Sequence, residues 1–244
     1  CKNDPLLRRP PFRSPHHTIS AGGLAGGGKV PGPGEMSLAH NGVLFLDELP
    51  EFRGDALEGL RQPMEDGQVT ITRVHGSAVF PARFMLVCAM NPCKCGWRGH
   101  PSGRCVCPEE AVRRYLSRIS GPILDRIDIF ASVPPVQYGE LTAARKGEAS
   151  ASIRRRVDVA RERQMKRQGV PNARLAGEQV KEYCPIDAES GEMMKMAFEK
   201  FALSARAYNK ILKVSRSIAD LEGSPQITRA HLAEALQYRN SIER

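Results

Sequence analysis

The sequence predicts an α/β domain followed by an all-α domain. Two apolar runs, Val43–Leu46 and Phe84–Met90, each end in polar residues, as the strands of a parallel sheet do at a ligand-binding edge. After Pro134-Pro135 the apolar residues recur at helical spacing and no further strand pattern is found. We therefore expect domains at residues 1–135 and 136–244.

The most informative segment is Gly42-Val43-Leu44-Phe45-Leu46-Asp47-Glu48, an apolar run that ends in two adjacent carboxylates. Four consecutive apolar residues suit a strand buried on both faces. This is the form of a Walker B strand, in which the first carboxylate holds phosphate-bound Mg²⁺ and the second polarises the attacking water. The alternative is a buried strand followed by a solvated acidic turn.

Two further polar residues fit the same kind of site. Asn91 follows the run Phe84–Met90, where its amide could orient a water beside a γ-phosphate or simply cap the turn at Pro92. Arg126 precedes a third strand-like stretch, Ile127–Val133, and could act in trans on a neighbour's phosphate. It could equally pair with the flanking aspartates at the surface.

Composition indicates a globular chain rather than a membrane or disordered one. Hydrophobic residues make up 41% of the 244, and no apolar run approaches the length of a membrane span. The net charge is +9, of which +3 falls in residues 1–135 and +6 in residues 136–244. A basic excess favours a polyanionic partner such as DNA but does not establish one.

The second domain reads as a set of amphipathic or charged helices. A very basic helix is expected over 148–167, where a solvated face and a DNA-binding face are both open interpretations. Further helices are expected over 188–201 and 204–221, with Thr228 as the N-cap of a last one.

Four of the seven cysteines form two C-x-C pairs, Cys93/Cys95 and Cys105/Cys107, separated by a glycine-rich loop of nine residues. Four thiolates around one Zn²⁺ are expected from this pattern, with a structural role and with His100 as a possible substitute ligand. Free thiols and disulfides are the alternatives. The pair His16-His17 has no third ligand in view, and we expect it to be structural.

Several long blocks of this chain resemble the AAA+ ATPases, in particular the magnesium-chelatase-like branch and its YifB/ComM group. They are residues 11–18, residues 34–42 leading into the acidic strand, and residues 117–128. The resemblance implies ATP and Mg²⁺ as cofactors, Asp47 and Glu48 as Walker B and Asn91 as sensor 1. It implies Arg126 as the arginine finger, with Arg118 as the runner-up. It also implies a C-terminal helical lid, with Arg206 as sensor 2.

The family's phosphate-binding loop is expected upstream of Cys1. The segment Gly23–Val30 has the glycines and a lysine, but Val30 lacks the hydroxyl that Mg²⁺ needs. Prolines at 31 and 33 then prevent the helix that would receive phosphate. By resemblance this stretch is instead the insert within helix 2, which faces a central pore. We therefore expect this chain by itself to bind and hydrolyse ATP poorly.

A β-hairpin is expected between the acidic strand and Asn91, from Val69–Thr72 and Val79–Phe84. By resemblance it is the pre-sensor-1 hairpin, which reaches into the pore of a ring. Arg73 and His75 at its tip could contact a phosphate backbone, or they could be ordinary surface residues.

Together these features predict a cytoplasmic ring ATPase, by resemblance a hexamer, that works on DNA and has no membrane segment. The most specific version is a ComM-like branch-migration helicase in natural transformation and recombination. One alternative is a chelatase-like motor that remodels a protein for metal insertion. Another is an oligomerisation and zinc-binding module without catalysis. No Ser-His-Asp pattern or spaced carboxylate pair points to another class of enzyme.

Overall fold

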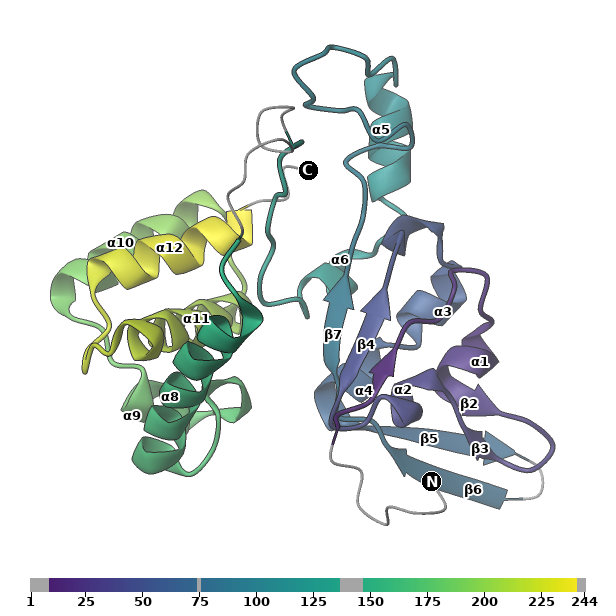
Figure 1. The fold of residues 1–244 in the computed structure, drawn as a ribbon, viewed down its shortest axis with the longest axis horizontal. Helices are drawn as coiled ribbons and strands as arrows, with labels where there is room; N and C mark the ends of the chain where they lie inside the picture. Colours follow the sequence, from purple (N-terminus) through teal and green to yellow (C-terminus); the bar gives the residue numbers. More distant parts are fainter. Residues whose placement is uncertain (1–8, 74–75, 137–146, 241–244) are drawn as a thin grey trace. The chain divides into compact units, whose positions relative to one another are not determined.

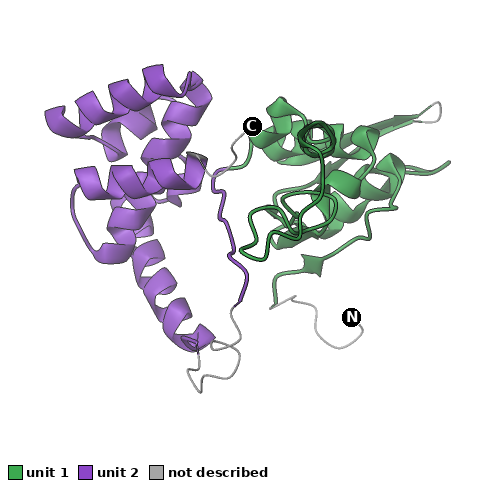
Figure 2. Ribbon diagram, turned by 90° about the horizontal axis from the view of Figure 1, so that it is seen from above, with its two compact units in different colours: residues 1–127 green, residues 128–244 purple. Residues whose placement is uncertain are grey.

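A computed structural model describes residues 9–73, 76–136 and 147–240. The chain forms two compact units, residues 1–127 and 128–244 (Figure 2). The first contains the strands and the second is helical (Figure 1). This division lies at Ile127, whereas the sequence places the boundary at Pro134-Pro135.

Unit 1 is built on a three-stranded parallel sheet in the order β1-β4-β7. Its strands are β1 (Phe12–Arg13), β4 (Val43–Leu46) and β7 (Met85–Cys88). Leu44 and Leu46 on β4 are fully buried in a core that the sheet forms with the short helices of unit 1. These helices are α1 (Ala21–Ala25), α2 (Glu35–Leu38), η1 (Leu49–Glu51), α3 (Gly54–Glu58), α4 (Arg61–Asp66) and α6 (Gly121–Leu124).

The sheet is covered less completely than the apolar runs suggest. On β7, Met85 and Val87 keep 64% and 38% of their surface exposed, because among the described residues the buried core lies on the other face. Burial on both faces was expected for β4, and there Val43 and Phe45 are only partly buried.

Two antiparallel hairpins extend from unit 1. One joins β2 (Gly26–Gly27) to β3 (Gly32–Pro33), and the other joins β5 (Gln68–Arg73) to β6 (Gly76–Pro81). The second confirms the hairpin predicted from sequence. The first begins within the segment Gly23–Val30, so Lys29 lies in the loop between β2 and β3 and opens no helix.

Unit 2 is a group of helices around its own core. The helices are α8 (Ser150–Gln168), η2 (Asn172–Arg174), α9 (Glu178–Tyr183), α10 (Ala188–Lys200), α11 (Ala205–Glu222) and α12 (Arg229–Asn240). Asp187 and Ser204 cap α10 and α11 by accepting hydrogen bonds from backbone N–H groups. The long helices confirm the sequence periodicity, while η2 and α9 are too short to have been predicted from it.

The third strand expected over Ile127–Val133 is wrong. Residues 127–136 form neither helix nor strand. The N–H of Phe130 donates to the carbonyl of Tyr238 on α12, and the guanidinium of Arg239 lies 5.6 Å from the Phe130 ring. This backbone bond of the segment is thus made to the end of a helix and not to a strand. Among the described residues, no helix has the length and apolar character needed to cross a membrane.

Candidate functional site

The predicted catalytic residues of β4 and β7 lie at one edge of the sheet. The parallel register pairs Leu46 with Cys88, so Asp47 and Asn91 both follow strands that end at the same level. Hydrogen bonds continue past the strands, from Ala89 N–H to Leu46 O and from Leu49 N–H to Ala89 O, both at 3.0 Å. The fold therefore places Asp47, Glu48 and Asn91 at the same edge of the sheet.

Both carboxylates at this edge are exposed, which suits groups that must meet a ligand. Asp47 Oδ1 accepts a hydrogen bond from the Glu48 N–H at 2.9 Å. Glu48 itself has left-handed backbone angles, φ 52° and ψ 46°, at the sharp turn into η1. Non-glycine residues rarely adopt this conformation, and such strain is concentrated at functional sites. Exposed carboxylate oxygens are suitable ligands for Mg²⁺, so Asp47 fits the metal-holding role.

A residue that the sequence marked as structural also belongs to this edge. His17 follows β1, which pairs in parallel with β4, and its Nδ1 lies 3.1 Å from Glu48 Oε2. Sequence spacing gave no signal of this contact, because the two residues are brought together only by strand pairing. His16 lies next to it, but its Nδ1 contacts Thr18 Oγ1 at 2.9 Å instead.

The two candidate arginine fingers are held differently. The Arg126 side chain is only 11% exposed, and it donates to Glu65 Oε1 and Pro122 O at 2.7 Å and to Arg61 O at 3.2 Å. Arg118 is 51% exposed and donates to Glu51 Oε2 at 2.9 Å, just beyond the acidic strand. Arg126 would have to leave three acceptors to reach a neighbouring subunit, whereas Arg118 is the more accessible.

Arg206 is exposed in the first turn of α11 in unit 2. It therefore lies on the helical unit, and its role as sensor 2 stays a prediction. On α8 of the same unit, some of the basic residues are engaged within the fold. Arg167 donates to Asp220 at 2.6 Å and Arg156 donates to Glu148 at 2.6 Å. These contacts favour a partly structural role for that basic helix.

The four cysteines of the two C-x-C pairs form one group, with all Sγ atoms within 4.8 Å of one another. Cys93 Sγ lies 3.3 Å from Cys95 Sγ and 3.7 Å from Cys105 Sγ, and the last two are 3.7 Å apart. Disulfides need about 2.05 Å. Four sulfurs at about 2.3 Å from a tetrahedral Zn²⁺ lie about 3.8 Å apart, so the donor set and spacing fit zinc.

The electrostatics of this group favour ionisation of one thiol. Burial opposes ionisation of Cys93, but hydrogen bonds from Cys95, from the Arg98 backbone and from Cys105 outweigh it and lower its pKa to about 6. The hydrogen bond with Cys95 raises the pKa of Cys107 to about 11. His100 lies outside the group, and its Nδ1 contacts Ser102 Oγ at 2.6 Å. The fitting ligands are therefore the four cysteines and not His100.

The two hairpins of unit 1 lie side by side (Figure 1). Gly26 has φ 115°, and a Cβ there would stand 2.6 Å from the Ile71 side chain, so β2 can approach β5 this closely only with glycine. The Nη2 of Arg73 lies 3.2 Å from the position of a Cβ on Gly27. Exposed Lys29 and Arg73 thus lie on neighbouring hairpins. His75 lies outside the described residues.

Comparison with known proteins supports the family resemblance found in the sequence. A family model described as magnesium chelatase, subunit ChlI, matches residues 1–141, and a model of its C-terminal part matches residues 147–239. The chain belongs to the magnesium-chelatase family. Unit 1 is accordingly part of the AAA+ core of this family, and unit 2 is its helical lid.

Individual relatives fall in the group predicted from sequence. The chain is 47% identical over 230 residues to the uncharacterized protein YifB of Salmonella typhimurium and 48% identical over 233 residues to the competence protein ComM of Haemophilus influenzae. These matches cover 94% and 95% of this chain but 45% of each relative. The magnesium-chelatase 67 kDa subunit of Chlorobaculum parvum is 39% identical over 69 residues, 28% of this chain and 11% of that protein.

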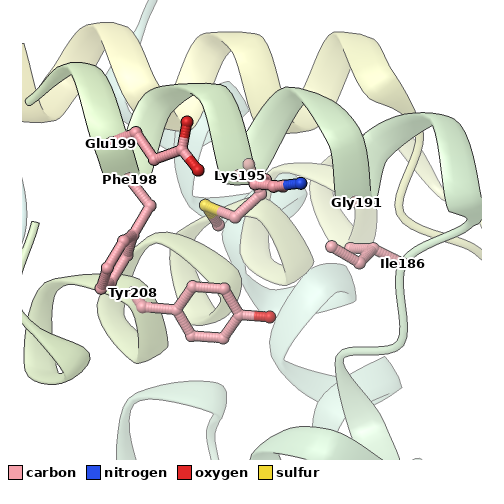
Figure 3. A pocket seen from close by; sticks show the side chains of 7 residues that line it. Ile186, Gly191, Lys195, Phe198, Glu199 and Tyr208 are labelled. Atoms are coloured by element: carbon pink, nitrogen blue, oxygen red, sulfur yellow. The ribbon is translucent and has the colours of Figure 1, made fainter.

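Unit 2 also has a shallow hollow of about 320 Å³ between α10 and α11 (Figure 3). Phe198, Met194 and Ile186 give it an apolar lining, and Lys195, Glu199 and Tyr208 bring polar atoms to it. None of the predicted catalytic residues lines it. The candidate site of this family member is therefore the polar edge of the sheet in unit 1.

Proposed function

We propose that the complete protein is an ATP-hydrolysing ring motor, a hexamer, that acts on DNA in the cytoplasm. The observation that carries the proposal is the common edge of β4 and β7, where Asp47, Glu48 and Asn91 follow paired strands. Membership of a family of AAA+ ATPases supports the same chemistry. Since the chain spans under half the length of its relatives, the proposal concerns the whole protein.

In this proposal each residue has one role. Asp47 holds the Mg²⁺ of Mg-ATP, Glu48 accepts a proton from the attacking water and Asn91 orients that water. Arg126 stabilises the charge that develops on a neighbouring subunit's nucleotide, with Arg118 as the alternative, and Arg206 contacts the nucleotide from the lid. The metal supplies charge neutralisation at the phosphates.

DNA is the proposed substrate for two reasons. Lys29 and Arg73 are exposed on adjacent hairpins, and paired cations suit contacts with a phosphate backbone. One relative bears the name competence protein, so we extend the proposal to ComM-like branch migration during recombination of incoming DNA.

The test is ATP turnover by the complete protein with and without branched DNA. We expect strong stimulation by DNA and its loss in Glu48→Gln, while Glu58→Gln, a nearby carboxylate bound to Arg61 and Ser120, keeps turnover. Neutral substitutions at Lys29 and Arg73 should lower the affinity for DNA. They should also make that affinity less dependent on the salt concentration. ATP turnover that DNA does not change would favour chelatase-like remodelling of a protein, which the match to a magnesium-chelatase subunit also supports.

We further propose that Cys93, Cys95, Cys105 and Cys107 hold one structural Zn²⁺. Reduced thiols at this spacing suit a cytoplasmic protein. Metal analysis of purified protein should give about one zinc per chain. Cys105→Ser should lose it, and Cys184→Ser, a buried cysteine of unit 2, should keep it. A zinc content far below one per chain would contradict the proposal.

A further inference from the structure

The loop between the two cysteine pairs carries an aromatic stack on the surface of unit 1. Trp97 is the only tryptophan of the chain, and 37% of its surface is exposed. The guanidinium carbon of Arg104 lies over its ring, 5.1 Å from the centroid, and the His100 ring meets it edge-to-face at a centroid distance of 4.9 Å. Neither the proposed ATP hydrolysis nor the proposed zinc site uses these three side chains.

The fold of the loop holds this stack in place. Trp97 comes two residues after Cys95 and Arg104 directly precedes Cys105, and the Sγ atoms of these cysteines are 3.7 Å apart. Between them, the His100 N–H donates to the Trp97 carbonyl and the Gly103 N–H donates to the His100 carbonyl, both at 3.1 Å. These turns bring Arg104 back over Trp97 without a ligand, so binding would require little further ordering of the loop.

The charge of this loop has one sign. Residues 93–108 contain three cations, Lys94, Arg98 and Arg104, and neither aspartate nor glutamate. Bound zinc would neutralise half of the charge of four thiolates, and the three cations outnumber the remainder. Arg98 donates to Glu109 of α5 at 2.7 Å, so Lys94 and Arg104 are the exposed cations of the loop that can meet an anionic ligand.

An aromatic ring beside exposed cations suits unpaired nucleic acid. Aromatic side chains stack on the faces of unpaired bases, while neighbouring cations contact the phosphates. In a duplex these faces are covered by the adjacent base pairs. The loop exposes two large apolar side chains, Trp97 and Val106, which are too few for the apolar core of a stable protein interface.

We propose that this loop binds single-stranded DNA, an inference that rests on the proposed action on DNA. An unpaired base stacks on Trp97, and Lys94 and Arg104 contact the flanking phosphates. The guanidinium of Arg104 gives up its place over the ring to the base and moves to a phosphate, where it forms a charge-assisted hydrogen bond. The site is separate from the hairpin cations Lys29 and Arg73.

The test measures the affinity of the complete protein for labelled oligo(dT) and for a duplex of the same length by fluorescence anisotropy. Trp97→Ala should weaken binding of oligo(dT) about ten-fold, because it removes one base-stacking contact, and should leave duplex binding nearly unchanged. Trp97→Phe keeps an aromatic face and should retain most of the affinity. Trp97→Leu keeps apolar bulk without a ring and should lose as much as Trp97→Ala.

Unit 2 provides a matched control. Phe201 is 42% exposed and Lys200 Nζ lies 5.5 Å from its ring centroid, but Glu199 precedes this pair. Phe201→Ala and Lys200→Gln should therefore leave binding of oligo(dT) unchanged. In contrast, Lys94→Gln and Arg104→Gln should each reduce the affinity and its dependence on salt, since each removes a phosphate contact. A metal content equal to that of wild type shows that the cysteine group of a variant is intact.

The fluorescence of Trp97 gives a second measurement, because it is the only tryptophan of this chain. Saturating oligo(dT) should quench this fluorescence, and the duplex should quench it less. An unchanged spectrum with oligo(dT) bound would overturn the inference.

The outcomes separate this inference from the proposed function. Wild-type affinity for oligo(dT) in both Trp97→Ala and Trp97→Leu would overturn the inference and leave the action on DNA intact. An equal loss of affinity for oligo(dT) and for the duplex would overturn recognition of an unpaired base. A wild-type protein that binds neither DNA would overturn the proposed action on DNA, and with it this site.

Discussion

Arg118 binds Glu51, three residues beyond Glu48, with its Nη1 2.9 Å from Oε2 and 3.2 Å from the carbonyl of Pro50. Arg118 follows helix α5 (Glu109–Leu116), which starts directly after the cysteine group. On the same helix, burial raises the pKa of Tyr115, and the nearby backbone of Asn91 opposes this shift. The segment from Cys107 through α5 to Arg118 thus links the proposed zinc site to the residues that follow β4.

Removal of zinc should loosen this helix more than the rest of the chain. With the metal chelated, we expect faster amide hydrogen exchange over 93–116, because the cysteine loop loses the ligand that holds it together. Exchange in α11 of unit 2 should stay unchanged, and it serves as the internal control. Uniformly faster exchange in both units, or no change in either, would contradict a local structural role.

The one-sided burial of the sheet can be measured with two substitutions. Leu44→Ala removes a fully buried side chain of β4 and should lower the free energy of unfolding by about 3 kcal/mol. Met85→Ala, on β7 with 64% of its surface exposed, should cost less than about 1 kcal/mol. Urea titrations of both variants provide the comparison, and similar losses would mean that the outer face of β7 is also packed.

The sequence was sufficient for the features that local patterns encode. The acidic strand, the hairpin at Gln68–Pro81 and the long helices of unit 2 follow from apolar periodicity and capping residues. Strand β1 was missed because a two-residue strand leaves no periodicity. The stretch after Arg126 was mistaken for a strand because β-branched residues there suit either a sheet or an extended segment bonded to α12.

Within the candidate site, the sequence indicated which residue types gather but not how they are held. The contact of His17 with Glu48 depends on the pairing of β1 with β4, and that of Arg126 with Glu65 joins the turn after α6 to helix α4. Neither contact has a signature in spacing. Tertiary packing alone therefore showed that Arg126 is largely buried and that Glu48 has a second partner.

A buried charge network should dominate the stability of unit 2. Asp220 is 1% exposed and accepts hydrogen bonds from Arg167 and Asn172, while Arg216, 2% exposed, donates to the same carboxylate. Asp220→Asn leaves the buried guanidinium without its counter-charge and should cost about 3 kcal/mol. The control is Glu189→Gln, which breaks an exposed pair with Arg229 and should cost under about 1 kcal/mol. Amide hydrogen exchange in α11 measures the loss of stability in both variants.

Stability should also depend on pH through the same carboxyl group. Burial alone would raise the pKa of Asp220, but hydrogen bonds from Arg167 and Asn172 and the charge of Arg216 outweigh it, so this pKa lies below its ordinary value. A depressed folded-state pKa stabilises the fold above the unfolded pKa of about 3.9, and this contribution is lost as pH falls through the folded-state pKa. The difference between wild type and Asp220→Asn should therefore be constant near neutral pH and shrink in acid. A difference that stays the same at pH 3 would contradict this origin.

The choice between Arg126 and Arg118 as the trans-acting arginine can be made by mixing subunits. If Arg126 serves the neighbour's site, Arg126→Ala and Glu48→Gln subunits should each be inactive alone but partly active together, because some interfaces then combine an intact arginine with an intact glutamate. Arg126→Ala should also lower the free energy of unfolding by about 1–2 kcal/mol, since it removes three hydrogen bonds and leaves Glu65 without this cation. Arg118→Ala, half exposed, should change stability less. Recovery on mixing with Arg118→Ala but not with Arg126→Ala would transfer the catalytic role to Arg118 and leave Arg126 as a structural residue of unit 1.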